Sequence, residues 1–145
     1  MMNSKTFHDI KTSMLFPPDA EAADNVAVVS AIIDTANFTS CTLVGLTGTM
    51  EDAAATWAIL VEDGDDASLS DNAAVADVFL VGTEAGVALD QADDDTWFKI
   101  GYIGPKRYVR MTVTPSDNGT AWALGGVALL GGSRKPPHTT QTGTD

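Results

Sequence analysis

The chain has 145 residues, 44% of them hydrophobic, a length and composition typical of one globular domain with its own core. Its 20 acidic residues outweigh 8 lysines and arginines, and the net charge of −12 argues against direct binding to nucleic acid, because phosphate contacts need clustered cations. The single cysteine, Cys41, excludes an internal disulfide, and no apolar run approaches the roughly 18 residues of a membrane span. We therefore expect a soluble protein with no membrane partner.

Residues 1–24 are predicted to form an extended N-terminal arm. Pro17 and Pro18 interrupt any regular element, because proline has no backbone N–H and restricts the residue before it. The segment nevertheless has more apolar side chains than a solvated tail needs, so we expect it to lie along its own domain or along a neighbouring chain. A frayed terminus is the alternative. The side chains of this arm predicted to contact a partner are Phe7, Ile10, Leu15 and Phe16.

Five strands are predicted before the last third of the chain. Each is a short run rich in β-branched or alternating apolar residues and is bounded by Gly, Asp or Asn. The predicted ranges are Val26–Asp34, Ser40–Thr47, Ala55–Glu62, Val75–Gly82 and the short Gly86–Leu89.

Two acidic runs separate these strands from one another and from the last third. Glu62–Asp66 has the composition of a calcium-binding loop, yet it lacks the EF-hand order of ligands, the bidentate Glu at the twelfth position and flanking helices. Asp93–Asp95 precedes a strand and is interpreted as a charged turn. We interpret both runs as solvated loops and predict no metal site.

The clearest β-pattern lies in residues 97–130. Trp97–Ile103 and Tyr108–Thr114 alternate side-chain character, and the turn signal Gly104-Pro105 between them predicts an antiparallel hairpin. The last strand, Thr120–Leu130, is apolar on both faces. It is therefore predicted to be central in a sandwich, or covered on its outer face by another subunit.

Together these patterns predict an all-β fold, an antiparallel β-sandwich for which we favour jelly-roll strand order. Periodicity alone leaves an immunoglobulin-like order open, although the paired cysteines of antibody domains are absent. The predicted organisation is an extended arm over residues 1–24, a sandwich domain over 25–132 and a short flexible C-terminal tail over 133–145.

The sequence offers little for catalysis. His8 and His138 both lie in terminal segments, Cys41 has no nearby histidine in sequence, and the metal, nucleophile and phosphate-binding motifs are missing. Paired carboxylates remain open, but the acids are concentrated in turns, which favours solvated loops. We predict that the chain is not an enzyme, with no catalytic residue, no cofactor and no metal.

Three cations lie close together in the sequence at Lys106, Arg107 and Arg110. They could form a patch for an acidic partner, contact acidic loops of the same or a neighbouring chain, or be ordinary surface charges. Arg110 projects on the polar face of its strand and is the best placed of the three for partner contact.

The stretch IGYIGPKRYVRMTVTPS, followed by ALGGVALLGGSRKPP, resembles a family of small structural proteins of tailed bacteriophages, the capsid decoration or cement proteins. The resemblance rests on Gly104, the run Lys106–Arg110, the aromatic pair Trp97-Phe98, the apolar strand 123–130 and the basic tail 134–137. It covers about a quarter of the chain. The segment VEDGDDASLSDNAAVADV is similar in style.

The resemblance implies a β-sandwich on the exterior of a phage capsid, made in the host cytoplasm, that binds and bridges neighbouring major capsid proteins. It also implies a homo-oligomer, either a trimer or a dimer, and adds Arg134 and Lys135 of the tail to the partner-binding candidates. It implies no catalytic residue.

Two alternatives stay open. One is another minor virion protein, of the tail or a head fibre. The other is a glycan-binding β-sandwich module that would use an exposed aromatic ring, Trp57 or Trp97, as a sugar platform, although such tryptophans more often belong to a core.

Overall fold

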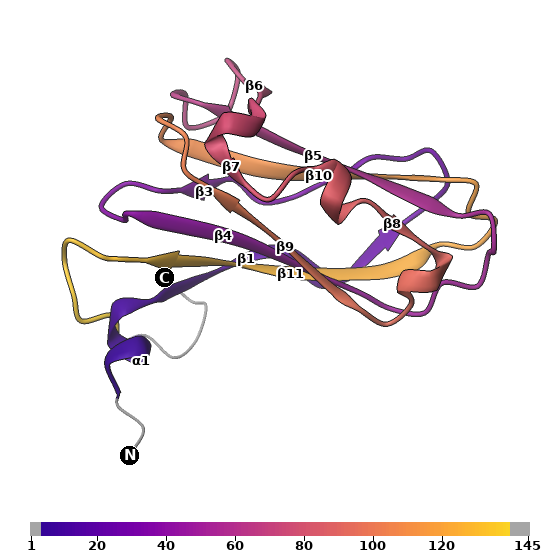
Figure 1. Cartoon of the computed structure of the whole chain (residues 1–145), viewed down its shortest axis with the longest axis horizontal. Coiled ribbons are helices and arrows are strands. Elements are labelled where there is room, and N and C mark those ends of the chain that lie inside the picture. The colour runs from indigo at the N-terminus through magenta and orange to yellow at the C-terminus, as the bar shows by residue number, and fades with distance from the viewer. Residues whose placement is uncertain (1–3, 140–145) are drawn as a thin grey trace.

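The computed structural model describes residues 4–139 as two antiparallel sheets packed face to face, which confirms the predicted all-β sandwich. Figure 1 shows the two layers, with β5 and β10 in one and β1, β4 and β11 in the other. We call the sheet that contains β1 sheet A, and its strand order is β1-β11-β4-β9-β7. These strands are Lys11–Ala22, Trp122–Gly131, Ser40–Thr47, Trp97–Tyr102 and Leu80–Val81 respectively.

The second layer, sheet B, has the order β2-β10-β5-β6, with β3 beside β10 and β8 beside β5. Its strands are Val28–Val29 (β2), Tyr108–Ser116 (β10), Thr56–Gly64 (β5), Ala73–Ala74 (β6), Ile33–Asp34 (β3) and Leu89–Asp90 (β8). The helical elements are α1 (Lys5–Asp9) and three single turns, η1 (Asp77–Phe79), η2 (Ala85–Val87) and η3 (Gln91–Asp93).

The strand order is that of a jelly roll. If β2 and β3 are taken as one interrupted strand and the short β7 and β8 are left aside, eight strands remain. They run 1-8-3-6 in sheet A and 2-7-4-5 in sheet B. Most successive strands therefore lie in opposite sheets, as in two nested Greek keys.

The core forms where the inward faces of both sheets meet. The indole rings of Trp57 in β5 and Trp122 in β11 stack with centroids 4.6 Å apart, joining sheet B to sheet A. Phe98 fills the space beside Gly45, where a Cβ would lie 2.1 Å from the phenyl ring. Because the ring occupies the position of a side chain, only glycine fits there.

The N-terminal segment lies along its own domain, which is one of the two arrangements expected for it. Residues 11–22 form β1, which pairs antiparallel with β11 from Lys11 opposite Leu130 to Ala22 opposite Trp122. The extended conformation of this segment was predicted correctly. The predicted boundary between arm and domain at residue 24, however, would separate β1 from the sheet to which it belongs. The register shifts on both sides of Phe16 let the strand pass Pro17 and Pro18, which could not continue a regular ladder.

The hairpin predicted between Trp97–Ile103 and Tyr108–Thr114 is wrong. Both strands exist as β9 and β10, but β9 pairs with β4 and β7 in sheet A, whereas β10 pairs with β5, β2 and β3 in sheet B. The turn at Gly104-Pro105 therefore carries the chain from one sheet to the other.

Three other predicted strands are shorter than expected. Val26–Asp34 is interrupted between β2 and β3, where the N–H of Ala31 donates instead to the carbonyl of Leu15. Val75–Gly82 becomes η1 followed by β7, and Gly86–Leu89 becomes η2 followed by β8. Their apolar residues are partly surface residues, with Val78 73% exposed. A run of apolar residues thus indicated a longer buried strand than the fold contains.

The described part of the tail, residues 133–139, contacts its own chain. The N–H of Arg134 donates to the carbonyl of Asn37, and the N–H of His138 donates to the carbonyl of His8 at 2.9 Å. The ring of His138 also stacks on Phe38. Residues 140–145 of the predicted tail lie outside the described residues.

Candidate functional site

The three cations of the 104–110 stretch are paired within the chain. Arg107 donates two hydrogen bonds to the carboxylate of Asp34, at 2.9 and 2.8 Å. The Nε–H of Arg110 donates to Glu62 at 2.9 Å, and the ammonium of Lys106 contacts Asp65. Three interpretations of these cations were considered from the sequence: a patch for an acidic partner, contacts with acidic loops, and ordinary surface charges. The observed contacts match pairing with acidic groups of the same chain.

These pairs set the protonation of the acids involved. The hydrogen bond from Arg107 holds the pKa of Asp34 below its ordinary value, and the hydrogen bond from Arg110 does the same for Glu62. The neighbouring Asp65 raises the pKa of Lys106. The cations are therefore engaged with acids of β3, of β5 and of the loop after β5, and a partner that used these cations would have to displace the carboxylates.

The other predicted contact residues fall into two groups. Leu15 and Phe16 are 0% and 1% exposed and belong to the core of their own domain, so a partner cannot reach them in this fold. Phe7 on α1 is half exposed and Ile10 after it is half-buried. In the tail, Arg134 and Lys135 are both exposed.

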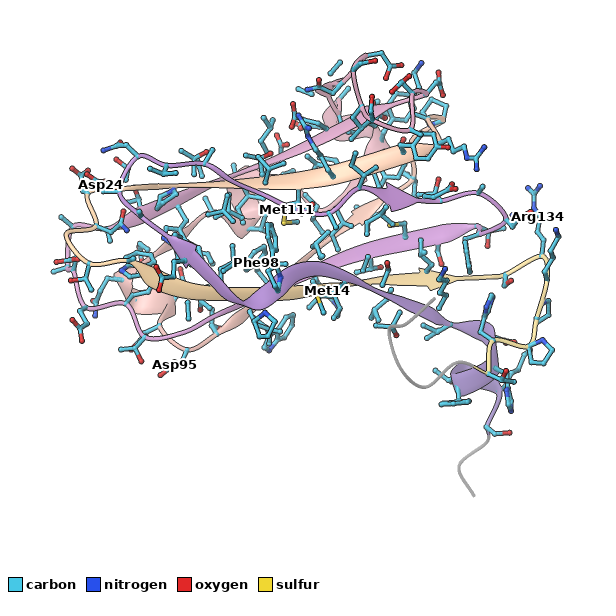
Figure 2. All side chains as sticks on the ribbon, turned by 180° about the vertical axis from the view of Figure 1, so that it is seen from behind. Met14, Asp24, Asp95, Phe98, Met111 and Arg134 are labelled. Atoms are coloured by element: carbon cyan, nitrogen blue, oxygen red, sulfur yellow. The ribbon has the colours of Figure 1, made fainter. Side chains whose placement is uncertain are left out.

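The main uncovered apolar surface is the outer face of sheet A. Met14, Val127 and Val44 are consecutive partners across β1, β11 and β4, and Leu46 lies opposite Trp97 on β9. These side chains point away from the core because they alternate with buried neighbours along each strand. Figure 2 shows Met14 on one side of sheet A and Phe98 between the layers. We name this surface the apolar face; its residues are Met14, Val44, Leu46, Trp97, Val127 and Leu129.

The apolar face is exposed and poor in charge. Trp97 and Met14 are each 59% exposed and Leu46 is 49% exposed. Among the outward side chains of sheet A that the structure describes, Glu21 is the one carboxylate and lies near the end of β1, opposite Ala123. Lys99 lies beside Trp97, with its ammonium 5.7 Å from the ring centroid. Sheet B differs, because its outward side carries the Glu62–Arg110 pair.

The sequence predicted part of this surface. Alternation along β9 is by itself enough to put Trp97 and Lys99 on the face opposite Phe98. Met14, Val44 and Leu46 were missed, because they join Trp97 only through pairing of strands distant in sequence. Trp57, the other predicted sugar platform, is stacked in the core.

The described residues contain no group of three or more His, Cys, Asp or Glu side chains arranged to hold a metal ion. In the acidic loop after β5, Asp71 instead accepts hydrogen bonds from the N–H groups of Asp65 and Asp66. Burial raises the pKa of the Cys41 thiol to about 12, which leaves it protonated and a poor nucleophile. Within residues 4–139, no helix is long and apolar enough to cross a membrane.

No protein-family profile matches the sequence, and no curated protein matches it significantly. Among solved structures, the chain is similar to the PBSX exported protein XepA, with a TM-score of 0.49 and 12% identity over 93% of this chain and 41% of that chain. It is also similar to a chain of infectious bursal disease virus Gx strain, with a TM-score of 0.45 and 12% identity over 88% and 33% of the two chains.

A third likeness is to the CBM22-1–GH10 modules of Clostridium thermocellum endo-1,4-beta-D-xylanase 10B, with a TM-score of 0.37 and 10% identity over 93% of this chain and 28% of that chain. The chain thus spans less than half the length of each of these three chains. At these scores and identities the likenesses carry no argument about function, so the functional argument rests on the surface described above.

Proposed function

We propose that this chain is a structural virion protein that binds the outer surface of a phage capsid and stabilises contacts between neighbouring major capsid proteins. It acts by binding and not by catalysis. The observation that supports an assembly role is the apolar face, an uncovered surface of sheet A on which Glu21 is the one carboxylate among the side chains that the structure describes, on a chain of net charge −12. The proposal of a phage capsid rests on the resemblance of residues 97–137 to the capsid decoration proteins of tailed bacteriophages.

A surface of this kind suits repeated contacts on a shell. The apolar side chains of this face gain free energy when they are removed from water, whereas the acidic loops stay hydrated at the exterior. Weak contacts repeated around a closed capsid act with high avidity. The same net charge keeps the protein away from the packaged nucleic acid.

The test is binding of the purified full chain to expanded phage heads that lack their decoration protein, measured by co-sedimentation over a range of concentrations. We expect saturable binding with a fixed number of chains per head and increased resistance of the heads to heat. Leu46→Ala on the apolar face should weaken this binding, and Leu60→Ala, at an exposed leucine on the outer face of sheet B, is the matched control. Binding that does not saturate, or that leaves head stability unchanged, would reject the proposal.

The exposed ring of Trp97 supports a second candidate, a glycan-binding module. An aromatic ring on an open sheet face can stack on a sugar, and Lys99 and Thr42 supply polar groups on the same face. A glycan array with the wild type and Trp97→Ala decides between the two. A signal that depends on Trp97, with no binding to heads, favours the glycan function.

A further inference from the structure

Three methionines lie within the described residues, and their exposure differs sharply. Met50 is 1% exposed and Met111 is 0% exposed, so both belong to the core. Met14 is 59% exposed and lies on the apolar face. In Figure 2, Met111 lies between the two layers, whereas Met14 lies on sheet A. A small oxidant dissolved in water therefore reaches the side chain of Met14 and is kept from the two core methionines.

Met14 contributes to the surface and not to the core. Its partner across the ladder is Val127 of β11, and the partner of Val127 is Val44 of β4, so the three side chains form one apolar row across the sheet. The next residue, Leu15, points to the opposite side and is fully buried. A chemical change at Met14 therefore alters the apolar face and leaves the packing of β1 against the core in place.

The thiol of Cys41 does not compete for the oxidant. Cys41 is 4% exposed, and burial raises its pKa to about 12. Peroxides react with the thiolate, so a buried and protonated thiol reacts slowly. Among the sulfur atoms of residues 4–139, the thioether of Met14 is the one that reacts first.

We propose that Met14 is a reversible oxidation site that controls docking of the apolar face. The thioether sulfur attacks one oxygen of hydrogen peroxide, so that an S–O bond forms and the O–O bond breaks. The released hydroxide takes the proton of the new S–OH group and leaves as water. The sulfur loses two electrons, which the peroxide gains. Methionine sulfoxide reductases reverse the change.

Oxidation replaces a soft apolar side chain with a polar one. In the free chain the sulfoxide oxygen is hydrated, because Met14 is exposed. When a partner covers the face, this oxygen loses its water beside Val127 and Val44, whose side chains donate no hydrogen bond. Oxidation therefore weakens docking, and docking in turn shields Met14 from the oxidant. This effect on docking rests on the proposed function, whereas the selective oxidation does not.

The first test treats the full-length protein with dilute hydrogen peroxide and locates the added oxygen by mass spectrometry. Cleavage after Asp and Glu places Met14, Met50 and Met111 in different peptides. We expect Met14 to be oxidised at least tenfold faster than the other two, with weaker retention on a phenyl column and an unchanged thermal melt. Equal rates at the three methionines, unchanged retention, or unfolding on oxidation of Met14 would overturn the inference.

The second test measures binding to the expanded heads before and after oxidation, with the peroxide removed before mixing. The affinity of the wild type should fall at least tenfold on oxidation. It should recover after treatment with the two methionine sulfoxide reductases, one for each sulfoxide epimer, and dithiothreitol. Met14→Gln carries a polar side chain of similar length and should bind weakly without peroxide. Leu60→Gln on the outer face of sheet B is its control.

Met14→Leu isolates the sulfur. This variant keeps an apolar side chain that peroxide does not oxidise, so its affinity, whatever its value, should be the same before and after treatment. It also retains Met1 and Met2, which lie outside the described residues, and so controls for their oxidation. A response to peroxide as large as that of the wild type would assign the effect to another residue and overturn the inference.

The outcomes for the two proposals separate. Heads that bind oxidised and untreated wild type equally well overturn the control of docking by Met14 and leave the virion function in place. A chain that is oxidised selectively at Met14 and loses retention on the phenyl column, yet binds heads in neither state, rejects the virion function and leaves the oxidation site in place.

Discussion

The hydroxyl of Tyr102 donates a hydrogen bond of 2.7 Å to Oδ2 of Asp63, and this bond joins the two sheets where the chain crosses between them. Tyr102 ends β9 in sheet A and Asp63 lies in β5 of sheet B. The same hydroxyl accepts the N–H of Lys106 at 3.1 Å, so it also fixes the crossing segment. Burial and the adjacent carboxylate of Asp63 raise the pKa of Tyr102, which keeps the phenol protonated and able to donate.

Replacing Tyr102 with phenylalanine should therefore destabilise the fold. The change removes the donor to a buried carboxylate, and an unsatisfied buried polar group costs about 1–3 kcal/mol. We expect a loss of that size in the free energy of unfolding, measured by urea denaturation. Tyr108→Phe, on the outer side of β10, is the control and should change stability by less than about 0.5 kcal/mol. Equal effects of the two changes would contradict the structural role of Tyr102.

The pair Glu62–Arg110 predicts a dependence of stability on pH. The hydrogen bond from Arg110 lowers the pKa of Glu62 below its ordinary value of 4.5 in the folded chain. A depressed folded pKa adds stability that is fully present above the unfolded value and is lost as the pH falls through the folded one. The contribution should therefore be complete at pH 7 and decline below about pH 4.5.

The variant Arg110→Gln tests this assignment. Removing the main cause of the shift should lower the free energy of unfolding at pH 7 and reduce the further loss on going to pH 3. Denaturant titrations at both pH values measure this. An acid-induced loss as large as in the wild type would show that other carboxylates dominate, with Asp34 the next to test through Arg107→Gln.

The glycine at position 45 is predicted to be irreplaceable because of Phe98. A Cβ there would lie 2.1 Å from the phenyl ring, and overpacking of this kind costs typically about 1–3 kcal/mol. Gly45→Ala should lower the melting temperature, and Phe98→Leu in the same chain should recover part of the loss. Gly119→Ala has more room and serves as the control. Additive effects of Gly45→Ala and Phe98→Leu would exclude the contact as the cause.

Local alternation predicted five strands well, because each packs one face against the core. Ser40–Thr47 was predicted at its observed bounds, and the predictions over 55–62, 97–103, 108–114 and 120–130 each overlap an observed strand. Strand pairing is not local, which explains the failed hairpin. Gly104-Pro105 signals a turn equally well whether the chain returns in the same sheet or crosses to the other.

The surface proposed to bind could be predicted only in part for the same reason. The exposed position of Trp97 follows from alternation within β9 alone. Its neighbour Leu46 comes from β4. Met14 comes from a segment that contains two prolines and that was predicted to be an arm. Only the register of the four strands β1, β11, β4 and β9 brings these side chains to one face.

The position of β1 predicts different outcomes for two truncations. Removing residues 1–9 deletes α1 and the hydrogen bond to His138, but leaves β1 and the core intact. Removing residues 1–16 also deletes Leu15 and Phe16, and full burial of side chains of this size contributes about 1.5–3 kcal/mol each. The longer truncation further leaves half of the β11 edge without its partner.

We therefore expect the shorter truncation to unfold cooperatively at a temperature close to that of the wild type. The longer one should lose several kcal/mol, a large share of the roughly 5–15 kcal/mol that stabilises a domain, and should be largely unfolded or aggregated. Thermal melts followed by circular dichroism measure both. A stable, cooperatively folding protein that lacks residues 1–16 would mean that the segment is an arm after all, free to contact a neighbouring chain.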